Sequence, residues 1–321
     1  MYKTLLLPAV ITLLALAGRA QVVYPYPSAA LPLHMEGKDS YLSYMDIPAP
    51  GGNGKTILLL HGKNFSGFYW KELIPLLVQL GYRVIVPDLP GWGHSGKPLL
   101  HYSFHMLATV NKSLLDSLKI DKVTVLGHSM GGMLAIRFAL MYAATVEKLV
   151  LENPIGLEDY KTFVPYQSLD KLYQKEKSAT YASYKKYQQS YYPQWKPVYE
   201  QYVEAQAEAL MSPGFDSIAR VNAVTYQMIY EQPVIYELER IQAPVLLIIG
   251  QADRTVVGKD LLTDEQKKQF GQYPQLGKKA AARIKNAKLI ALPGVGHIPH
   301  VQDLAAFTAA LFPFLQAQRG A

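Results

Sequence analysis

The chain has 321 residues, 50% of them hydrophobic, which is enough apolar material for a large buried core and excludes a disordered protein. The 32 Lys and Arg residues exceed the 25 Asp and Glu residues, but they are spread along the chain, so the net charge of +7 argues against a nucleic-acid partner. Because cysteine is absent, disulfides, thiolate catalysis and cysteine-based zinc sites are excluded.

The first twenty residues have the pattern of an export signal. Lys3 precedes an apolar run from Thr4 to Gly18, and small residues lead to a cleavage point after Ala20. The run is short for a bilayer span, although an uncleaved N-terminal anchor is the alternative. We therefore expect a signal peptide over residues 1–20, an exported (periplasmic or secreted) protein, and no stable membrane span after cleavage.

Strand and helix patterns alternate through the first half of the chain. Residues 21–32 contain three prolines and are expected to form an extended or irregular lead-in. The short apolar runs that follow are typical of strands buried on both faces, so a mostly parallel sheet with helices on both faces is predicted. The predicted strands are Ser40–Ile47 (an edge strand), Lys55–Leu60, Arg83–Pro87, Lys122–Leu126 and Val146–Leu151, and the helices are Gly67–Leu80 and Ser103–Leu118.

The alternation stops between residues 153 and 239 and then resumes. This interval holds 13 of the 23 tyrosines and no buried-strand pattern, so we expect three or four helices, broken at Pro193, Pro197, Pro213 and Pro233. Tyrosine has an apolar body and a polar tip, which suits either a wet substrate cleft or an amphipathic surface. Beyond it we predict strands at Pro244–Ile249 and Ala287–Leu292 and helices at Gly277–Lys285 and Leu304–Gln316.

A G-x-S-x-G sequence, Gly127-His-Ser-Met-Gly131, joins a predicted strand to a helix that ends near Tyr142. Glycines lie two residues before and two residues after Ser129, at positions 127 and 131, as a sharp strand-to-helix turn requires. At the start of a helix, Ser129 would lie beside free backbone N–H groups that stabilise a developing oxyanion. We therefore predict a nucleophile at Ser129, and an unreactive turn serine is the alternative.

A nucleophilic serine needs a base that is itself oriented by an acid. Asp253 and His297 each follow a predicted strand, at the carboxyl edge of the sheet where sites of α/β proteins collect. His300 is the alternative to His297, and Glu152 is the alternative to Asp253. The order serine, acid, histidine differs from the orders found in trypsin and subtilisin.

Several short motifs together resemble the α/β-hydrolase superfamily over residues 35–315. They are His61-Gly62, Asp88-Leu-Pro-Gly91, Gly127-His-Ser-Met-Gly131, Gly250-Gln-Ala-Asp253 and Gly296-His297. The resemblance implies an α/β-hydrolase core over residues 21–152 and 240–321, with a helical cap, residues 153–239, inserted after the sixth core strand.

The resemblance also implies roles for the site residues. Ser129 would be the nucleophile, His297 the general base and acid, and Asp253 the residue that holds the imidazole. The oxyanion hole would consist of the Met130 amide and an amide from Lys63 or Asn64. His61 is interpreted as a structural histidine that bonds loop backbone, and His128 as one that packs beside the elbow.

The implied activity is that of a serine hydrolase acting by acyl transfer on carboxylic esters of small or medium size. Carbon–carbon bond, amide or lactone hydrolysis and perhydrolysis are alternatives with the same triad. Epoxide hydrolysis and dehalogenation are disfavoured, since they use an aspartate where this chain has Ser129. A non-catalytic ligand-binding protein is the alternative from another class. The expected partner is a small-molecule substrate, no metal or organic cofactor is expected, and the oligomeric state is left open.

Overall fold

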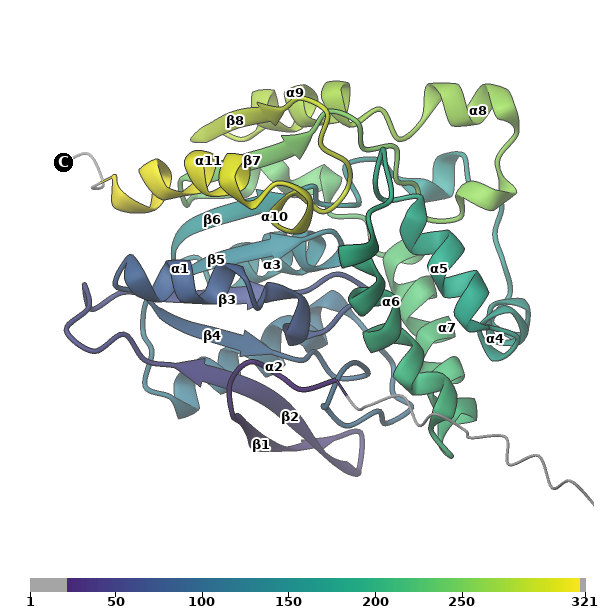
Figure 1. Cartoon of the computed structure of the whole chain (residues 1–321), viewed down its shortest axis with the longest axis horizontal. Coiled ribbons are helices and arrows are strands. Elements are labelled where there is room, and N and C mark those ends of the chain that lie inside the picture. The colour runs from purple at the N-terminus through teal and green to yellow at the C-terminus, as the bar shows by residue number, and fades with distance from the viewer. Residues whose placement is uncertain (1–21, 318–321) are drawn as a thin grey trace, which may run out of the picture.

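A computed structural model describes residues 22–317, built around one eight-stranded sheet (Figure 1). The strand order is β1-β2-β4-β3-β5-β6-β7-β8. The pairs β1/β2 and β2/β4 are antiparallel and all others are parallel, which confirms the predicted fold class. The strands are β1 (Ser28–Met35), β2 (Lys38–Ile47), β3 (Thr56–Leu60), β4 (Arg83–Pro87), β5 (Val123–His128), β6 (Val146–Glu152), β7 (Val245–Gly250) and β8 (Ala287–Leu292). The predicted signal peptide lies outside the described residues.

Helices cover both faces of the sheet, so its central strands β3, β5, β6 and β7 are buried along almost their whole length. In β3, Ile57 and Leu59 face one hydrophobic cluster while Leu58 and Leu60 face the other. The first cluster contains side chains of α1 (Leu73–Gln79) and α11 (Leu304–Gln316). The second contains side chains of α2 (Phe104–Ser117), α3 (Met130–Met141) and α9 (Tyr273–Arg283).

The N-terminal part of the sheet corrects two expectations. Part of the supposed irregular lead-in, residues 21–32, belongs to β1, which forms a hairpin with β2 through Glu36 and Gly37, both with positive φ (50° and 71°). Pro32 is tolerated because β1 is the outermost strand. The strand predicted at Ser40–Ile47 is confirmed within β2, but its edge position is wrong because β1 lies outside it.

One predicted helix is divided in the structure, one begins earlier than predicted, and one agrees fully. The predicted helix Gly67–Leu80 is divided into a 3₁₀ turn, η1 (Gly67–Trp70), and α1. Helix α9 begins four residues earlier than predicted, with Pro274 in its first turn, where a missing N–H costs nothing. The helix Leu304–Gln316 is confirmed with the predicted bounds.

Four α-helices lie between β6 and β7, grouped beside one end of the strands (Figure 1). They are α4 (Leu169–Lys177), α5 (Tyr181–Gln189), α6 (Glu200–Ala207) and α7 (Phe215–Glu231), and α4 packs on α7 while α5 packs on α6. The remaining short helices are η2 (Tyr160–Thr162), η3 (Pro197–Tyr199), η4 (Glu208–Met211), η5 (Ile235–Arg240), η6 (Lys259–Leu261), α8 (Asp264–Gln269) and α10 (Pro299–Gln302). No helix within residues 22–317 is long and apolar enough to cross a membrane.

The tyrosines of this interval are divided between interior and surface. Seven of the thirteen are buried, so the interpretation as an amphipathic surface is wrong for them: Tyr160, Tyr173, Tyr184, Tyr191, Tyr192, Tyr199 and Tyr202. Tyr166, Tyr187 and Tyr236 are exposed.

Candidate active site

Ser129 stands at the junction of β5 and α3 in a strained backbone conformation, with φ 56° and ψ −120°. Non-glycine residues seldom adopt a positive φ, and such strain persists only where the surroundings enforce it. The surroundings here are crowded: a Cβ atom at Gly127 would collide with the carbonyl oxygen of Gly131, and one at Gly131 would collide with that of Leu60. The two glycines therefore permit the sharp turn that places the Ser129 hydroxyl at the start of α3.

Ser129, His297 and Asp253 meet although they are far apart in the sequence. His297 Nε2 lies 2.9 Å from Ser129 Oγ, and His297 Nδ1 lies 2.7 Å from Asp253 Oδ2. An ionised carboxylate only accepts hydrogen bonds, so the proton of the neutral imidazole is on Nδ1 and Nε2 is free to accept the serine hydroxyl. The three residues follow β5, β8 and β7 and are 7%, 1% and 2% exposed. The loops after three parallel strands thus form one hydrogen-bonded series.

The Asp253 carboxylate is held by three donors. Oδ2 accepts hydrogen bonds from His297 and from Asn153 Nδ2, at 2.6 Å, and Oδ1 accepts one from the Thr255 amide at 2.8 Å. Burial alone would raise the pKa of Asp253, but the adjacent imidazole and these hydrogen bonds hold it below its ordinary value. Asp253 is therefore ionised and oriented toward His297.

Asn153 was not anticipated from the sequence. It follows β6 directly, has φ 36°, and its Oδ1 accepts the Gly250 amide at 2.9 Å while its Nδ2 binds Asp253. Asparagine tolerates positive φ better than most residues. An asparagine directly after a predicted buried strand was therefore the sequence signal that could have indicated Asn153. The two alternative site residues, Glu152 and His300, bind each other and not His297.

The loop after β3 approaches the nucleophile closely, since a Cβ atom at Gly62 would lie 3.1 Å from Ser129 Cβ. The Phe65 amide donates to the Gly62 carbonyl at 3.1 Å, which makes Lys63 and Asn64 the central residues of a tight turn. Met130 lies in the first turn of α3, where amides have no acceptor within the helix. All three predicted oxyanion donors thus belong to segments beside Ser129.

His61 fixes the orientation of this loop. Its Nε2 accepts the Leu89 amide at 2.9 Å, so its Nδ1–H donates to the Gly62 carbonyl at 2.8 Å. Burial lowers the pKa of His61, which keeps it neutral. These contacts bear out the interpretation of His61 as a structural histidine. Because a trans peptide is planar, holding the Gly62 carbonyl also fixes the direction of the Lys63 N–H.

Tyr191 brings the helical interval into contact with both loops. Its carbonyl accepts the His297 amide at 2.7 Å, and its ring stacks on the imidazole with centroids 4.8 Å apart. Its hydroxyl accepts a hydrogen bond from Asn64 Nδ2 at 2.8 Å. Burial raises the pKa of Tyr191 well above its ordinary value, so the phenol is neutral.

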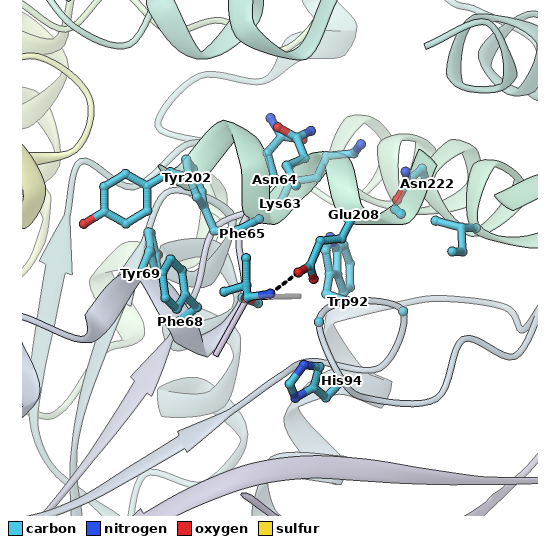
Figure 2. Close-up of a pocket in the computed structure, with 18 of the residues that line it drawn as sticks. Lys63, Asn64, Phe65, Phe68, Tyr69, Trp92, His94, Tyr202, Glu208 and Asn222 are labelled. Carbon is cyan, nitrogen blue, oxygen red and sulfur yellow. Dashed lines mark hydrogen bonds between the residues drawn. The ribbon is translucent and has the colours of Figure 1, made fainter. Parts of the chain in front are cut away.

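A cavity of about 320 Å³ lies between the core and helices α6 and α7 (Figure 2). Its lining is rich in aromatic side chains: Phe65, Phe68, Tyr69, Trp92, Tyr184 and Tyr202. Ser129, Asp253 and His297 do not line it. Asn64 does, and its hydrogen bond to Tyr191 connects the cavity wall to the residue that stacks on His297.

The N-terminal segment forms one wall of this cavity. The Tyr24 hydroxyl donates to Asp88 Oδ2 at 2.8 Å, and its ring stacks on His94 with centroids 4.0 Å apart. The Val22 amide donates to the Glu208 carboxylate, drawn as the dashed line in Figure 2. Residues 22–24 thus contact both the core and the helical interval.

The two lysines of the cavity wall are already engaged. Lys63 Nζ lies 3.4 Å from Glu176 Oε1, and Lys97 Nζ donates to the carbonyl oxygens of Gly93 and Ser95 at 2.7 and 3.0 Å. Among the residues in the described part of the chain, no three His, Asp or Glu side chains are grouped so that they could hold a metal ion.

Comparison with known proteins agrees with this architecture. A family model described as alpha/beta hydrolase fold matches residues 55–304. The crystal structure of a probable hydrolytic enzyme from Pseudomonas aeruginosa PAO1 is 43% identical, covers 92% of this chain and 96% of its own, and has a TM-score of 0.90. A 2-hydroxy-6-oxononadienedioate/2-hydroxy-6-oxononatrienedioate hydrolase of Pseudomonas putida is 28% identical over 87% of this chain and 92% of that protein. An uncharacterized protein of Mycobacterium tuberculosis is 39% identical over 106 residues, so the match spans 33% of this chain and 31% of that protein's length.

Proposed function

Because the chain belongs to the α/β-hydrolase family, we propose that it is a serine hydrolase that acts by acyl transfer on carboxylic esters of small or medium size. One observation carries the proposal. One ring nitrogen of His297 is hydrogen-bonded to Ser129 Oγ and the other to the Asp253 carboxylate. This is the geometry that activates a serine hydroxyl.

The proposed reaction has two halves. Ser129 Oγ attacks the ester carbonyl carbon while its proton passes to His297 Nε2. The tetrahedral intermediate collapses as that proton passes to the leaving alcohol oxygen, which breaks the ester bond and leaves an acyl-serine. Water then attacks the acyl carbon, His297 takes its proton, and collapse returns that proton to Ser129 Oγ as the acid leaves. Asp253 stays ionised throughout and stabilises the imidazolium.

The oxyanion of each intermediate would accept hydrogen bonds from the backbone amides of Met130 and Lys63. Met130 is supported by its place in the first turn of α3. We favour Lys63 over Asn64 because the peptide that joins Gly62 to Lys63 is held by His61 and by the Phe65 amide. The Lys63 side chain, engaged with Glu176, takes no part in this role.

The substrate class rests on the cavity between the core and helices α6 and α7. Its aromatic lining suits an apolar acyl or alcohol group that enters past Asn64. Carbon–carbon bond hydrolysis of a dioate is the second candidate, because the Pseudomonas putida relative bears that name. A dioate carries two carboxylates, whereas both lysines of the cavity wall are engaged and Glu208 adds a negative charge. Esters are therefore proposed first.

Two further parts of the chain are included in the proposal. Helices α4–α7 would act as a cap that shapes access to Ser129, which is supported by the contacts of Tyr191 with His297 and Asn64. Residues 1–20 would direct export, which is supported by the charged start, the apolar run and the small residues before the cleavage point.

A substrate panel tests the proposed class. Purified protein and its Ser129→Ala variant would be assayed with p-nitrophenyl esters of increasing acyl length, an anilide, a lactone and a dioate diketone. We expect turnover of the esters, with kcat/KM reduced at least about 10³-fold in the variant. Turnover of the diketone alone would favour the second candidate, and no turnover of any compound would oppose both.

A further inference from the structure

We propose that Tyr69 and His128 are positioning residues that hold the oxyanion loop and the His297 loop at a fixed separation beneath Ser129. The inference rests on the proposed function, since it assigns these residues a role in the same reaction. Neither residue was given a chemical role by its sequence pattern. The evidence is a continuous series of hydrogen bonds among buried groups.

The series runs from the loop after β3 to the loop after β8. The Gly62 amide donates to the Tyr69 hydroxyl at 2.9 Å, and that hydroxyl lies 3.1 Å from His128 Nδ1. His128 Nε2 lies 2.8 Å from the carbonyl oxygen of His297. His128 also directly precedes Ser129 in the chain. One network therefore reaches the oxyanion loop, the nucleophile and the base.

The donor and acceptor in each hydrogen bond of the series follow from the His297 carbonyl, where the series ends. The His297 carbonyl can only accept, so His128 Nε2 carries a proton and donates it. Burial lowers the pKa of His128 well below its ordinary value, as do the nearby His297 and His300, so the ring is neutral and Nδ1 has a free lone pair. Tyr69 must then donate its hydroxyl proton to Nδ1 and accept the Gly62 N–H on its oxygen.

Packing leaves the series no room to rearrange. Tyr69 and His128 are fully buried. The Tyr69 ring stacks on Phe65 at 4.7 Å between centroids and meets the Trp70 ring edge-on at 4.6 Å. Burial raises the pKa of the Tyr69 phenol well above its ordinary value, so it remains a donor.

The consequence for catalysis is geometric. Gly62 is held at its amide by Tyr69 and at its carbonyl by His61, so both peptide units beside it have fixed planes. One of these units carries the Lys63 N–H of the proposed oxyanion hole. Because the same network ends on the His297 backbone, the donor and the base cannot shift independently. Such preorganisation lowers the barrier through the backbone groups that Tyr69 and His128 hold, and it is separate from the place of the Tyr69 ring in the cavity wall.

The test is removal of the shared hydroxyl. Tyr69→Phe keeps the ring but leaves the Gly62 N–H and His128 Nδ1 without a partner. We expect kcat for a short ester to fall about tenfold to 100-fold while KM changes less than about threefold, since the lost interaction acts on the transition state. Tyr82→Phe is the matched control, because Tyr82 is equally buried and donates to the Leu315 carbonyl at 3.0 Å, away from the site. The control should lose comparable stability but retain kcat.

A second variant, His128→Gln, and the NMR spectrum of the wild-type protein test the same hydrogen-bond series independently of Tyr69→Phe. His128→Gln retains a donor for the His297 carbonyl but has no acceptor at the position of Nδ1, to which Tyr69 donates. The kcat of the double variant with Tyr69→Phe should therefore be no lower than that of the poorer single variant. In ¹⁵N-histidine-labelled wild-type protein, His128 should show a neutral ring with its proton on Nε2.

The outcomes separate this proposal from the proposed function. Unchanged kcat in Tyr69→Phe, purely additive losses in the double variant, or a His128 ring protonated on Nδ1 would overturn the positioning role in an active enzyme. Absence of Ser129-dependent turnover in the wild type would overturn the proposed function instead, and the histidine spectrum would still test the hydrogen-bond series.

Discussion

His300 Nδ1 lies 2.9 Å from both carboxylate oxygens of Glu152, and the His300 amide donates to the same carboxylate at 2.8 Å. Residues 22–317 therefore contain two buried acid–histidine pairs, and of these two the pair of Asp253 and His297 reaches Ser129. His300 instead stacks on Trp70, with ring centroids 4.1 Å apart. The Glu152 pair is thus assigned to the core, where breaking it would leave a buried charge or donor unpaired.

This separation predicts different effects for the two acids. Asp253→Asn should lower kcat about 10³-fold to 10⁴-fold, because the wrong tautomer of His297 is then favoured. Glu152→Gln should lower the denaturation midpoint but reduce kcat less than about tenfold. Steady-state kinetics and urea denaturation of both variants check this. A larger kcat loss in Glu152→Gln than in Asp253→Asn would reverse the assignment.

Asn153 should contribute to the orientation of Asp253. Asn153→Ala removes a donor to the carboxylate and an acceptor for the Gly250 amide, so we expect kcat to fall about tenfold. Asn111→Ala is the control, since Asn111 is equally buried and donates to the Leu107 carbonyl within α2. Equal kcat for both variants, at equal stability, would contradict a role for Asn153 in the site.

Tyr24 should influence which esters are accepted. Tyr24→Ala removes a ring from the cavity wall, so kcat/KM for long acyl chains should rise several-fold relative to acetate esters. Tyr24→Phe preserves the ring and removes only the hydroxyl that donates to Asp88, and its chain-length profile should resemble that of the wild type. A profile unaltered in Tyr24→Ala would show that the cavity does not hold the acyl group.

Stability should fall on mild acidification. His61 and His128 have pKa values below the ordinary value of about 6.5, so below that pH the unfolded chain binds more protons than the folded one. The free energy of unfolding should therefore decrease as pH falls from about 6.5, by at most about 1.4 kcal/mol per pH unit for each proton. The pKa of Asp253 is also lowered, so the free energy of unfolding should decrease further as pH falls below the ordinary aspartate pKa of 3.8.

Urea denaturation at a series of pH values measures this dependence. His128→Gln should have a shallower slope between pH 6.5 and 5 than the wild type, because one of the neutral buried imidazoles is gone. A wild-type midpoint that rises on acidification, or identical slopes for both proteins, would contradict the assignment of His128 as neutral.

Much of the fold was predictable because inner strands such as β3 and β7 are short, nearly continuous apolar runs. Thr56–Leu60 is buried at every residue, a pattern that a sheet covered on both faces requires. β1 was missed because Pro32 and the two prolines before the strand suggested irregular structure. An edge strand tolerates Pro32, however, and the Glu36-Gly37 pair is suited to a two-residue hairpin turn.

The site residues that the sequence indicated are those with local signals. Ser129 stands in a glycine-flanked turn, and Asp253 and His297 each follow a buried strand. Tyr69 and Tyr191 carry no such signal, because their importance comes from partners more than 50 residues away, such as His128 and His297. Periodicity identifies buried tyrosines poorly, since the polar tip makes surface and interior positions look alike.

The central claim, that Ser129 is a nucleophile activated by His297, is tested most directly by labelling folded protein with a fluorophosphonate and locating the adduct by peptide mass spectrometry. We predict one adduct on Ser129, absent in Ser129→Ala and formed at least about 10³-fold more slowly in His297→Ala. No adduct on Ser129, or labelling of equal rate in the His297→Ala variant, would contradict it.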